Sequence, residues 1–478
     1  MIGVILLMMT WVNLSPIPYL ANIIGTTVPA LQLLLSILWG YPLAIIFNKK
    51  LRENTEYKNV IFALMGFDIA VYNFGLSFAH NLVPVAVIYL TTKLLGPGRN
   101  NAIITLIFNM VYLLNGYIQT ESEDYDITWT MPHCVLTLKV IALSFDLWDG
   151  QKKKEGVVLS ANTSKTAVEN LPEILDLLGF IYFPACFLVG PTFSFRRYQD
   201  FVRDVYPIKS EETQMASQAM KRLLQGLGYL IAYQVGVTVF NMKYMLSDEF
   251  GETSIVYRHF YCGMWAHFAL YKYISCWLLA EASCIRFGLS FNGYEDTVNG
   301  KVSQWDACNN IILMEFEGAT KFQHYINSFN CNTNYFASEY VYKRLKFLGN
   351  RYLSQFFTLL FLALWHGIRS GYYMTFFNEY IIIYMEKELE ALLVQTTIYD
   401  KIWNSSAKSL VYVFLKSYTF VFMGWSLAPF DLKIFWKWWH VYSSLYFSGF
   451  LIFLPWPLVY KPLLKKALKS YSKKAKET

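Results

Sequence analysis

His366 is the residue whose type and position most directly suggest chemistry. It follows an apolar run over residues 356–365, which has the pattern of a helix buried in lipid or protein. An ionisable side chain is costly there and usually faces a cavity or a polar partner. Two roles are open: a neutral imidazole that donates one hydrogen bond to a neighbouring helix, or a base inside the protein. Gly367 and Gly371 form a G-x-x-x-G pattern, which allows close helix approach beside the histidine.

A neutral imidazole, whose ordinary pKa is about 6.5, can take a proton from an alcohol that attacks a carbonyl. Acyl transfer by this route also needs an anchor for the hydroxyl or a donor to the developing oxyanion, and an uncharged amide can provide either. Four asparagines in a short polar stretch offer such an amide: Asn327, Asn330, Asn332 and Asn334. A loop that caps itself has the same composition, and the spacing does not choose among the four.

The elements that must position these residues are indicated by composition. The 478 residues are 55% hydrophobic and 18% aromatic, and only 16% are charged. Soluble domains carry about a quarter of their residues as charges, so the chain is predicted to be a polytopic membrane protein. The 41 Lys and Arg exceed the 34 Asp and Glu, giving a net charge of +7. The basic clusters flank apolar runs, which indicates cytosolic loops and argues against nucleic-acid binding.

Apolar runs long enough to cross a bilayer, roughly 20 residues each as helix, recur along the chain. They cover residues 29–47, 60–78, 102–118, 174–195, 223–239, 265–285, 356–384, 410–427 and 442–460. Two further runs, 82–95 and 134–145, are too short for a comfortable crossing, and three arrangements are open for them: tilted, half-inserted or buried in protein. We expect an all-α transmembrane bundle of roughly 10–11 helices that encloses a buried reaction chamber. Residues 1–478 are predicted to form one membrane-embedded domain.

Other chemistries are disfavoured. The seven cysteines are odd in number and form no C-x-x-C pair, so neither a disulfide framework nor a zinc site is indicated. No serine stands in a G-x-S-x-G frame, the pattern of a hydrolase nucleophile. A lipid or solute transporter would explain the helices, but it predicts inverted repeats that the sequence does not show.

Several segments resemble the membrane-bound O-acyltransferase family and, within it, the lysophosphatidylcholine acyltransferase branch. Its histidine motif matches residues 365–372, after the apolar residues 360–364. Further matching segments are residues 125–139, 187–191, 291–294, 305–308 and 342–350. The match runs from near residue 30 to the end of the chain.

The resemblance implies a reaction. An acyl chain, expected to be polyunsaturated, moves from acyl-CoA to the sn-2 hydroxyl of a 1-acyl lysophospholipid. Lysophosphatidylcholine is the first expected acceptor, followed by lysophosphatidylethanolamine and lysophosphatidylserine. Acyl-CoA is then a co-substrate, with no permanently bound cofactor and no metal. A sterol, a diacylglycerol or a protein is the alternative acceptor, and a homodimer in the bilayer is compatible with the resemblance.

The resemblance also implies site residues. The histidine of the family falls on His366, and its catalytic asparagine falls on Asn330. Phe336 stands where the family usually has a tryptophan, which keeps the aromatic character but removes an indole donor.

Two basic stretches complete the expectations. Lys343, Arg344 and Lys346 are predicted to meet the phosphates of CoA from the cytosol, although a positive cytosolic flank has the same composition. The tail at residues 473–478 resembles a lysine-based retrieval signal through Lys474 and Lys476. That resemblance predicts a location in the endoplasmic reticulum membrane and a cytosolic C-terminus.

Overall fold

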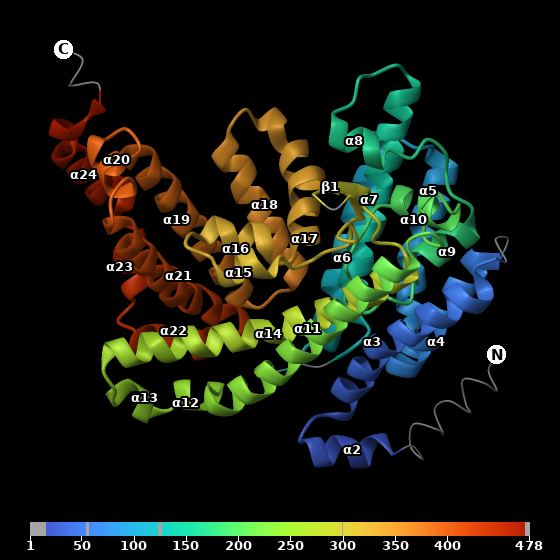
Figure 1. Cartoon of the computed structure of the whole chain (residues 1–478), viewed down its shortest axis with the longest axis horizontal. Helices are drawn as coiled ribbons and strands as arrows, with labels where there is room; N and C mark the ends of the chain where they lie inside the picture. Colours follow the sequence, from blue (N-terminus) through green and yellow to red (C-terminus); the bar gives the residue numbers. More distant parts are fainter. Residues whose placement is uncertain (1–15, 54–56, 123–126, 299, 474–478) are drawn as a thin grey trace. The chain divides into compact units, whose positions relative to one another are not determined.

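The architecture is helical throughout the residues that the computed structural model describes, which are 16–53, 57–122, 127–298 and 300–473. In this part of the chain the strands are β1 (Tyr294–Thr297) and β2 (Gly300–Ser303), an antiparallel hairpin with Tyr294 opposite Ser303. The predicted all-α class is therefore confirmed. Figure 1 shows the order of the elements along the chain.

The chain divides into two compact units, each discontinuous in sequence. Unit 1 comprises Met1–Tyr229, Ile274–Asn310 and Asn332–Arg344, and unit 2 comprises Leu230–Tyr273, Ile311–Cys331 and Leu345–Thr478. The assignment of residues 1–478 to one domain stays a prediction.

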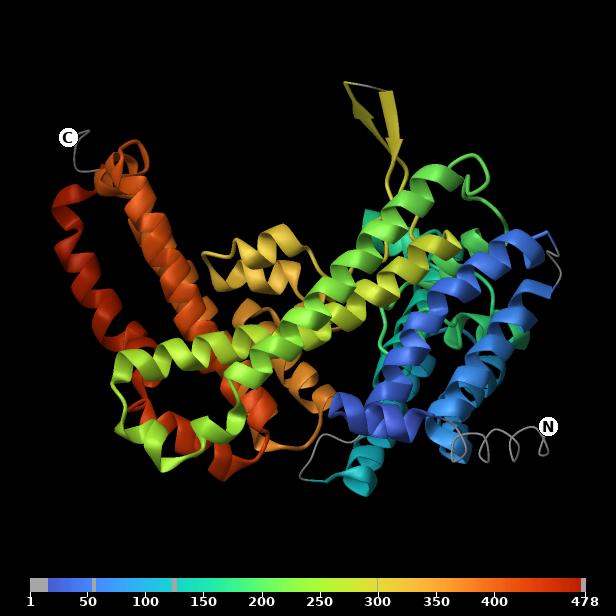
Figure 2. The same ribbon diagram turned by 60° about the horizontal axis from the view of Figure 1, so that its bottom comes forward.

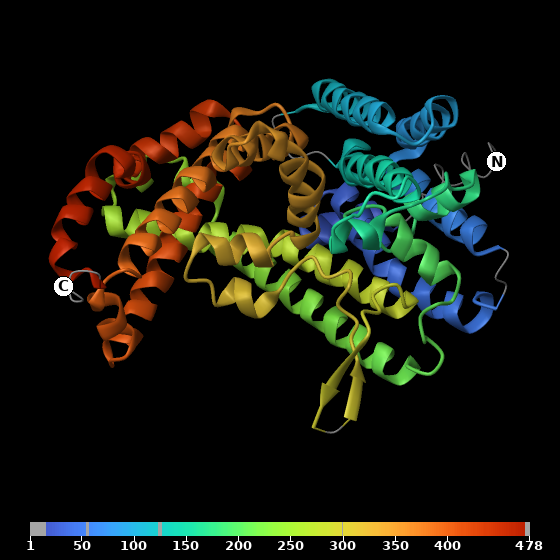
Figure 3. The same cartoon turned by 90° about the horizontal axis from the view of Figure 1, so that it is seen from above.

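The helical elements of unit 1 lie in the first half of the chain and in a short return segment. They are α2 (Ile17–Ile24), α3 (Val28–Ile46), η1 (Phe47–Leu51), α4 (Lys58–Phe74), η3 (Gly75–Asn81), α5 (Leu82–Leu95), α6 (Arg99–Thr120), α7 (Thr130–Lys154), α8 (Ala161–Thr166), α9 (Ile174–Ile181), α10 (Phe195–Val202) and η4 (Ala337–Tyr342). Within this unit α6 packs along α7, and α4 packs along α9 (Figure 3).

The helical elements of unit 2 come mostly from the last third of the chain. They are α12 (Met242–Met245), α13 (Asp248–Glu252), α15 (Leu313–Glu317), α16 (Phe322–Ser328), α18 (Arg351–His366), α19 (Ser370–Leu393), α20 (Thr397–Trp403), α21 (Ala407–Leu432), α22 (Phe435–Ser444), α23 (Ser448–Phe453), η6 (Trp456–Tyr460), α24 (Lys461–Ala467) and η7 (Lys469–Tyr471). Four elements have residues in both units: α11 (Glu212–Val239), α14 (Ile255–Phe287), α17 (Cys331–Phe336) and η5 (Lys343–Leu348).

Six helices in the described residues are long and apolar enough to cross a membrane, or seven if one bent pair counts as a span. They are Val28–Leu51, Lys58–Leu95, Arg99–Thr120, Thr130–Lys154, Glu212–Met245 and Ala407–Leu432, and the pair is Phe435–Ser444 with Ser448–Ala467, bent by 70°. The chain is therefore a multi-pass membrane protein, with fewer full-length spans than the 10–11 helices expected at membrane depth.

The predicted span over residues 174–195 is wrong. Helix α9 ends at Ile181, and the chain then turns through residues that include Pro184 and a cis Gly190–Pro191 bond before α10 begins. The side chains of Tyr182 and Phe183 are fully buried in the core of unit 1. The apolar run therefore fills a protein core through an irregular segment, where a proline cannot continue a helix.

The short run over residues 134–145 lies inside α7, a continuous helix of 25 residues, and burial in protein is the one of its three expected alternatives that the helix fits. Its polar residues lowered the apparent length of the apolar run, but 78% of its most apolar window is buried in protein. Lys139 lies inside this run: its Nζ donates to the Phe180 carbonyl oxygen at 2.6 Å and lies 4.3 Å from the Phe180 ring centroid. A buried ammonium is tolerated when it has such partners.

A proline organises the packing of α19, α21 and α22 in unit 2. Pro429 lies inside α21 and lacks the N–H that would donate to the Trp425 carbonyl. The hydroxyl of Tyr442 on α22 donates to that carbonyl at 3.0 Å instead. Asn378 on α19 donates its amide to the same hydroxyl at 2.6 Å, and both Asn378 and Tyr442 are fully buried. The missing helix bond is thereby replaced by a link among three helices.

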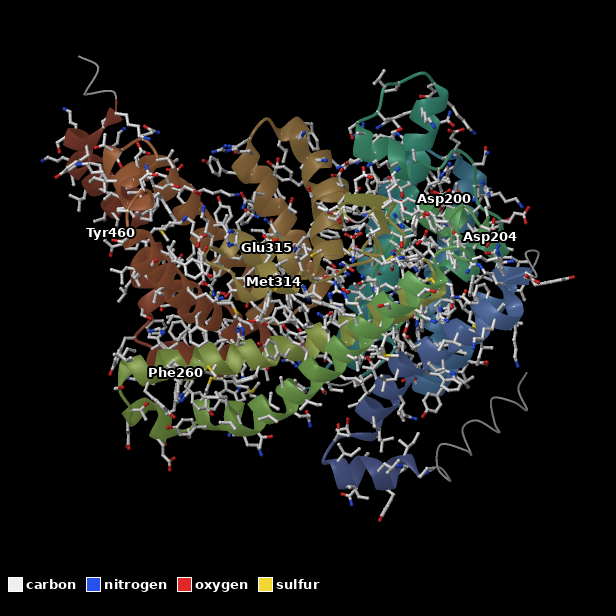
Figure 4. All side chains as sticks on the ribbon, in the orientation of Figure 1. Asp200, Asp204, Phe260, Met314, Glu315 and Tyr460 are labelled. Carbon is white, nitrogen blue, oxygen red and sulfur yellow. The ribbon has the colours of Figure 1, made fainter. Side chains whose placement is uncertain are left out.

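Two features of unit 1 lie at its surface. The β1–β2 hairpin projects from the helices, as Figure 2 shows, and Val298 at its tip is fully exposed. Asp204 follows α10 and is labelled with Asp200 in Figure 4. Its carboxylate accepts from Arg52 at 3.2 Å and from Lys58 at 2.5 Å, which ties the start of α4 to the end of α10.

Substitution of Gly66 tests the contact between α4 and α9. A Cβ at this position would overlap the Tyr182 carbonyl oxygen, which is backbone and cannot move aside. We expect Gly66→Ala to lower the free energy of unfolding by about 1–3 kcal/mol through overpacking, measured by thermal melting in detergent. Gly228→Ala in α11 is the control, because a Cβ there meets nothing within 4 Å. Equal melting temperatures for the two variants would contradict this account.

Candidate functional site

His366 is the last residue of α18, at the point where the helix stops. Gly367 follows with φ 138°, a conformation that glycine adopts without strain, and its N–H donates to Ala363 and Leu364 carbonyls. Helix α19 begins at Ser370, so the histidine lies in a tight reversal between two helices. Unit 2 holds all of these residues.

Aromatic rings surround the His366 imidazole. The ring centroid lies 4.6 Å from that of Trp365, 4.9 Å from Phe430, 5.4 Å from Phe376 and 5.7 Å from Tyr372. Such apolar surroundings disfavour the imidazolium and favour the neutral ring, which can accept a proton.

One of the two roles open for His366 is to donate a hydrogen bond to a neighbouring helix. The imidazole forms no such bond with any described residue. Protein surrounds the ring, and the side chain is half-buried. The imidazole nitrogens are therefore available to a molecule that enters beside them.

Gly367 and Gly371 have different structural roles, although both belong to the G-x-x-x-G pattern. Gly367 lies in the reversal and not on a helix face. Gly371 lies in the first turn of α19, where a Cβ would overlap the Pro429 carbonyl of α21, and its N–H donates to the Lys433 carbonyl at 2.9 Å. The expected close helix approach is therefore made by Gly371 and brings Phe430 of α21 against His366. Nothing in the sequence pairs Phe430 with the histidine, and sequence analysis missed it.

Asn330 lies in unit 2, in the link between α16 and α17, and is half-buried. Its φ is 51°, the left-handed region that few residues other than glycine and asparagine adopt. The residues just before it are fixed by backbone bonds: the Ile312 N–H donates to the Ser328 carbonyl at 2.8 Å, and Ile311 bridges to Phe329. The amide is thus carried by a rigid link.

Side chains beneath the link hold it from α14 and α15. Phe316 stacks on Phe329 with centroids 5.7 Å apart. Its neighbour Glu317 accepts from His267 at 3.1 Å and from the Tyr271 hydroxyl at 3.0 Å, so the carboxylate fixes α15 against α14. Burial raises the pKa of Tyr325 to about 12, so the hydroxyl below this link stays protonated.

Two of the other asparagines, Asn327 and Asn332, support the loop. Asn327 donates to Glu315 on α15, labelled in Figure 4, at 3.4 Å. Asn332 donates to the Asn309 carbonyl at 3.1 Å and to the Asn310 side chain at 3.0 Å. Asn332 and Asn334 belong to unit 1, whereas Asn330 shares unit 2 with His366. Phe336 is buried and packs on Tyr340, with centroids 5.2 Å apart.

The three basic residues predicted to meet CoA differ in their surroundings. Arg344 donates to the Asp149 carboxylate from both terminal guanidinium nitrogens, Nη1 and Nη2, and its guanidinium lies 5.1 Å from the Phe145 ring centroid. Lys343 pairs with Glu339. Lys346 is exposed, and no described residue pairs with it. The structure places Lys343 and Arg344 in unit 1 and Lys346 in unit 2.

The seven cysteines lie in the described residues, and none of them forms a disulfide there. In the part of the chain that the structure describes, no three His, Cys, Asp or Glu side chains are placed to hold a metal ion. The chemistry that the arrangement around His366 can perform is proton transfer by a neutral imidazole.

Comparison with known proteins adds independent information. The model of the membrane-bound O-acyltransferase family matches residues 114–428. A Mus musculus protein named lysophospholipid acyltransferase 5 is 40% identical over 461 residues, which cover 96% of this chain and 93% of the relative. The protein of the same name from Drosophila melanogaster is 40% identical over 448 residues, with 92% and 88% covered. The Homo sapiens protein of that name is 38% identical over 461 residues, with 96% and 93% covered.

Substitutions of Asn330 separate its backbone role from its amide. Asn330→Gly and Asn330→Ala both remove the amide. Only alanine is strained in the left-handed backbone conformation, which destabilises the folded state by roughly 1–2 kcal/mol. We therefore expect the glycine variant to melt at a higher temperature than the alanine variant. The same two proteins, assayed for turnover, should both be inactive if the amide does chemistry. A glycine variant with full turnover would leave Asn330 a purely structural role.

Proposed function

The chain belongs to the membrane-bound O-acyltransferase family, and from this premise we propose that it is an acyl-CoA-dependent lysophospholipid acyltransferase. The relatives at 38–40% identity are named lysophospholipid acyltransferases, which supports the reaction class. The observation that carries the proposal is His366, enclosed by aromatic rings at the end of α18 and not hydrogen-bonded by any described residue.

In the proposed reaction, the Nε2 or Nδ1 atom of neutral His366 takes the proton of the sn-2 hydroxyl. The hydroxyl oxygen attacks the thioester carbonyl, and a tetrahedral oxyanion forms. When this intermediate collapses, the carbon–sulfur bond breaks, the acyl group remains on the lipid oxygen, and His366 returns the proton to the CoA thiolate. The protein enters and leaves the cycle unchanged, and the products are a phospholipid and CoA.

The Asn330 amide fits a second role in this reaction. Its NH₂ group can donate to the oxyanion, or its carbonyl oxygen can accept from the hydroxyl and orient it. An uncharged amide does this without the cost of burying a charge. The rigid link that carries Asn330 supports this role, because such donors act best when they are held in place before the reaction.

For the acceptor we propose lysophosphatidylcholine first, then lysophosphatidylethanolamine and lysophosphatidylserine, and for the donor a polyunsaturated acyl-CoA. The protein is proposed to lie in the endoplasmic reticulum membrane with a cytosolic C-terminus, and a homodimer stays a prediction. Lys474 and Lys476, on which the retrieval signal depends, lie outside the described residues.

Among the predicted CoA contacts, Lys346 is the strongest candidate. The Arg344 guanidinium is occupied by Asp149, whose side chain is 2% exposed, so that pair serves the packing of unit 1. Lys346 has an exposed ammonium that can reach a phosphate.

Replacement of His366 tests the proposed base. We expect His366→Ala to reduce acyl transfer at least about 100-fold, the usual contribution of a positioned general base. The assay supplies labelled acyl-CoA and a panel of lysophospholipids to the purified protein in detergent. Melting temperature is the control for folding. Near-normal turnover in a folded His366→Ala protein would remove the histidine from the mechanism.

Neutralisation of Lys346 tests the CoA contact. We expect Lys346→Ala to raise the Michaelis constant for acyl-CoA about threefold to tenfold with little change in kcat, because one charge-assisted contact is lost. A topological role would leave the constant unchanged. Arg344→Gln is the contrasting variant: it leaves the buried Asp149 carboxylate with only the longer contact to Lys152 at 3.5 Å, so it should lower the melting temperature, whereas Lys346→Ala should not.

A further inference from the structure

A second functional group lies one helical turn beyond the rings that pack on His366. Glu379 belongs to α19, and Tyr372, Phe376 and Glu379 are spaced four and three residues apart. That spacing places all three on one face of the helix. Tyr372 and Phe376 are the α19 residues whose rings contact His366, at 5.7 Å and 5.4 Å. Glu379 therefore continues the helix face that borders the imidazole, about 4.5 Å further along the axis than Phe376.

The Glu379 carboxylate has no protein partner among the described residues. No hydrogen bond or ion pair joins it, and no charged side chain of the described residues acts on it. Protein surrounds the side chain, which is half-buried. An enclosed carboxylate without a counter-ion is costly, so such groups are kept where a ligand supplies the missing charge.

Thr375 adds a second polar group on the same face. It lies four residues before Glu379, and its hydroxyl is buried without a hydrogen-bond partner. Together with the rings of Tyr372 and Phe376, the face offers a carboxylate, a hydroxyl and aromatic surface within two helical turns. Carboxylates and aromatic faces are the groups that bind quaternary ammonium ions.

We infer that Glu379 binds the ammonium of the acceptor headgroup, so that the face of α19 from His366 to Glu379 holds one zwitterionic lysophospholipid. The inference rests on the proposed function and adds the headgroup class. In a lysolipid with a choline or ethanolamine headgroup, two glycerol carbons, the phosphate and a two-carbon link separate the sn-2 hydroxyl oxygen from the ammonium. When the sn-2 hydroxyl lies at His366, the phosphate of the same lipid therefore lies near Thr375 and Phe376, and its ammonium lies near Glu379. Sequence analysis missed Glu379, although an acidic residue inside an apolar run was the available signal.

The test is the headgroup preference of Glu379→Gln, which keeps the shape of the side chain and removes its charge. Wild type and variant are assayed with lysophosphatidylcholine and lysophosphatidylethanolamine, which carry an ammonium, and with lysophosphatidylglycerol, which does not. We expect kcat/KM for the two ammonium lipids to fall at least about tenfold, as when one partner of an enclosed charge pair is removed. The values for lysophosphatidylglycerol and the Michaelis constant for acyl-CoA should stay close to those of wild type.

Glu390→Gln is the matched control, because Glu390 lies on the same helix and pairs with Lys321 at 2.5 Å. It should leave the headgroup preference unchanged. Glu379→Asp should restore part of the preference. If lysophosphatidylglycerol is a poor substrate, thermal stabilisation by each lysolipid replaces turnover, and the variant should lose the extra stabilisation given by the choline lipid.

Three results would overturn the inference. One is an equal loss with every headgroup, which would assign Glu379 to the chemical step. Another is an unchanged preference. The third is a reduced melting temperature of both Glu379 variants without lipid, which would make the carboxylate a structural group. Failure of the proposed function looks different, since wild type would then acylate none of the lysophospholipids.

Discussion

The close approach of α19 to α21 at Gly371 is the constraint on which the site around His366 depends. With hydrogen as its only side chain, this residue lets the first turn of α19 touch the backbone of α21 at Pro429 and Lys433. That contact sets the Phe430 ring against both His366 and Tyr372, with centroids 4.9 Å and 5.1 Å apart. The imidazole is therefore positioned by ring packing and by the end of its helix, and its nitrogens form no hydrogen bond with any described residue.

Several features were predictable because they depend on local composition. The apolar run before His366, the glycine after it and the turn-like stretch around Asn330 each report a local preference of the chain. The fold class follows from the same information. The predictions of membrane spans failed where a segment is buried in protein, because burial in protein and burial in lipid favour the same apolar composition. The run over residues 174–195 is apolar because it fills the core of unit 1. Helix α7 extends beyond the run over residues 134–145 because the polar residues at the ends of that run, His133 and Asp146, are buried in protein within the same helix. Long-range partners such as Phe430 leave no trace in local spacing.

Buried charge is handled in three ways in this protein. Lys139 donates to a backbone carbonyl and lies against aromatic rings, and Arg344 forms a two-pronged pair with Asp149. Both arrangements are complete within unit 1 and serve its packing. Glu379 has neither kind of partner among the described residues. The contrast separates charges that stabilise the fold from a charge that is left for a ligand, and ligand-binding groups often carry such an energetic cost.

The proline in α21 has an evolutionary consequence. Pro429 leaves the Trp425 carbonyl without its helical donor, Tyr442 supplies the donor, and Asn378 holds the Tyr442 hydroxyl in place. Each of these three residues contributes to this hydrogen-bond arrangement only while the other two are present, so the effects of substituting them on the free energy of unfolding are not additive. A lineage that lost the proline would regain the ordinary helix bond and release the tyrosine hydroxyl and the asparagine amide from selection. Positions 378, 429 and 442 should therefore drift as a set, and their covariation among relatives would record a contact that joins three helices.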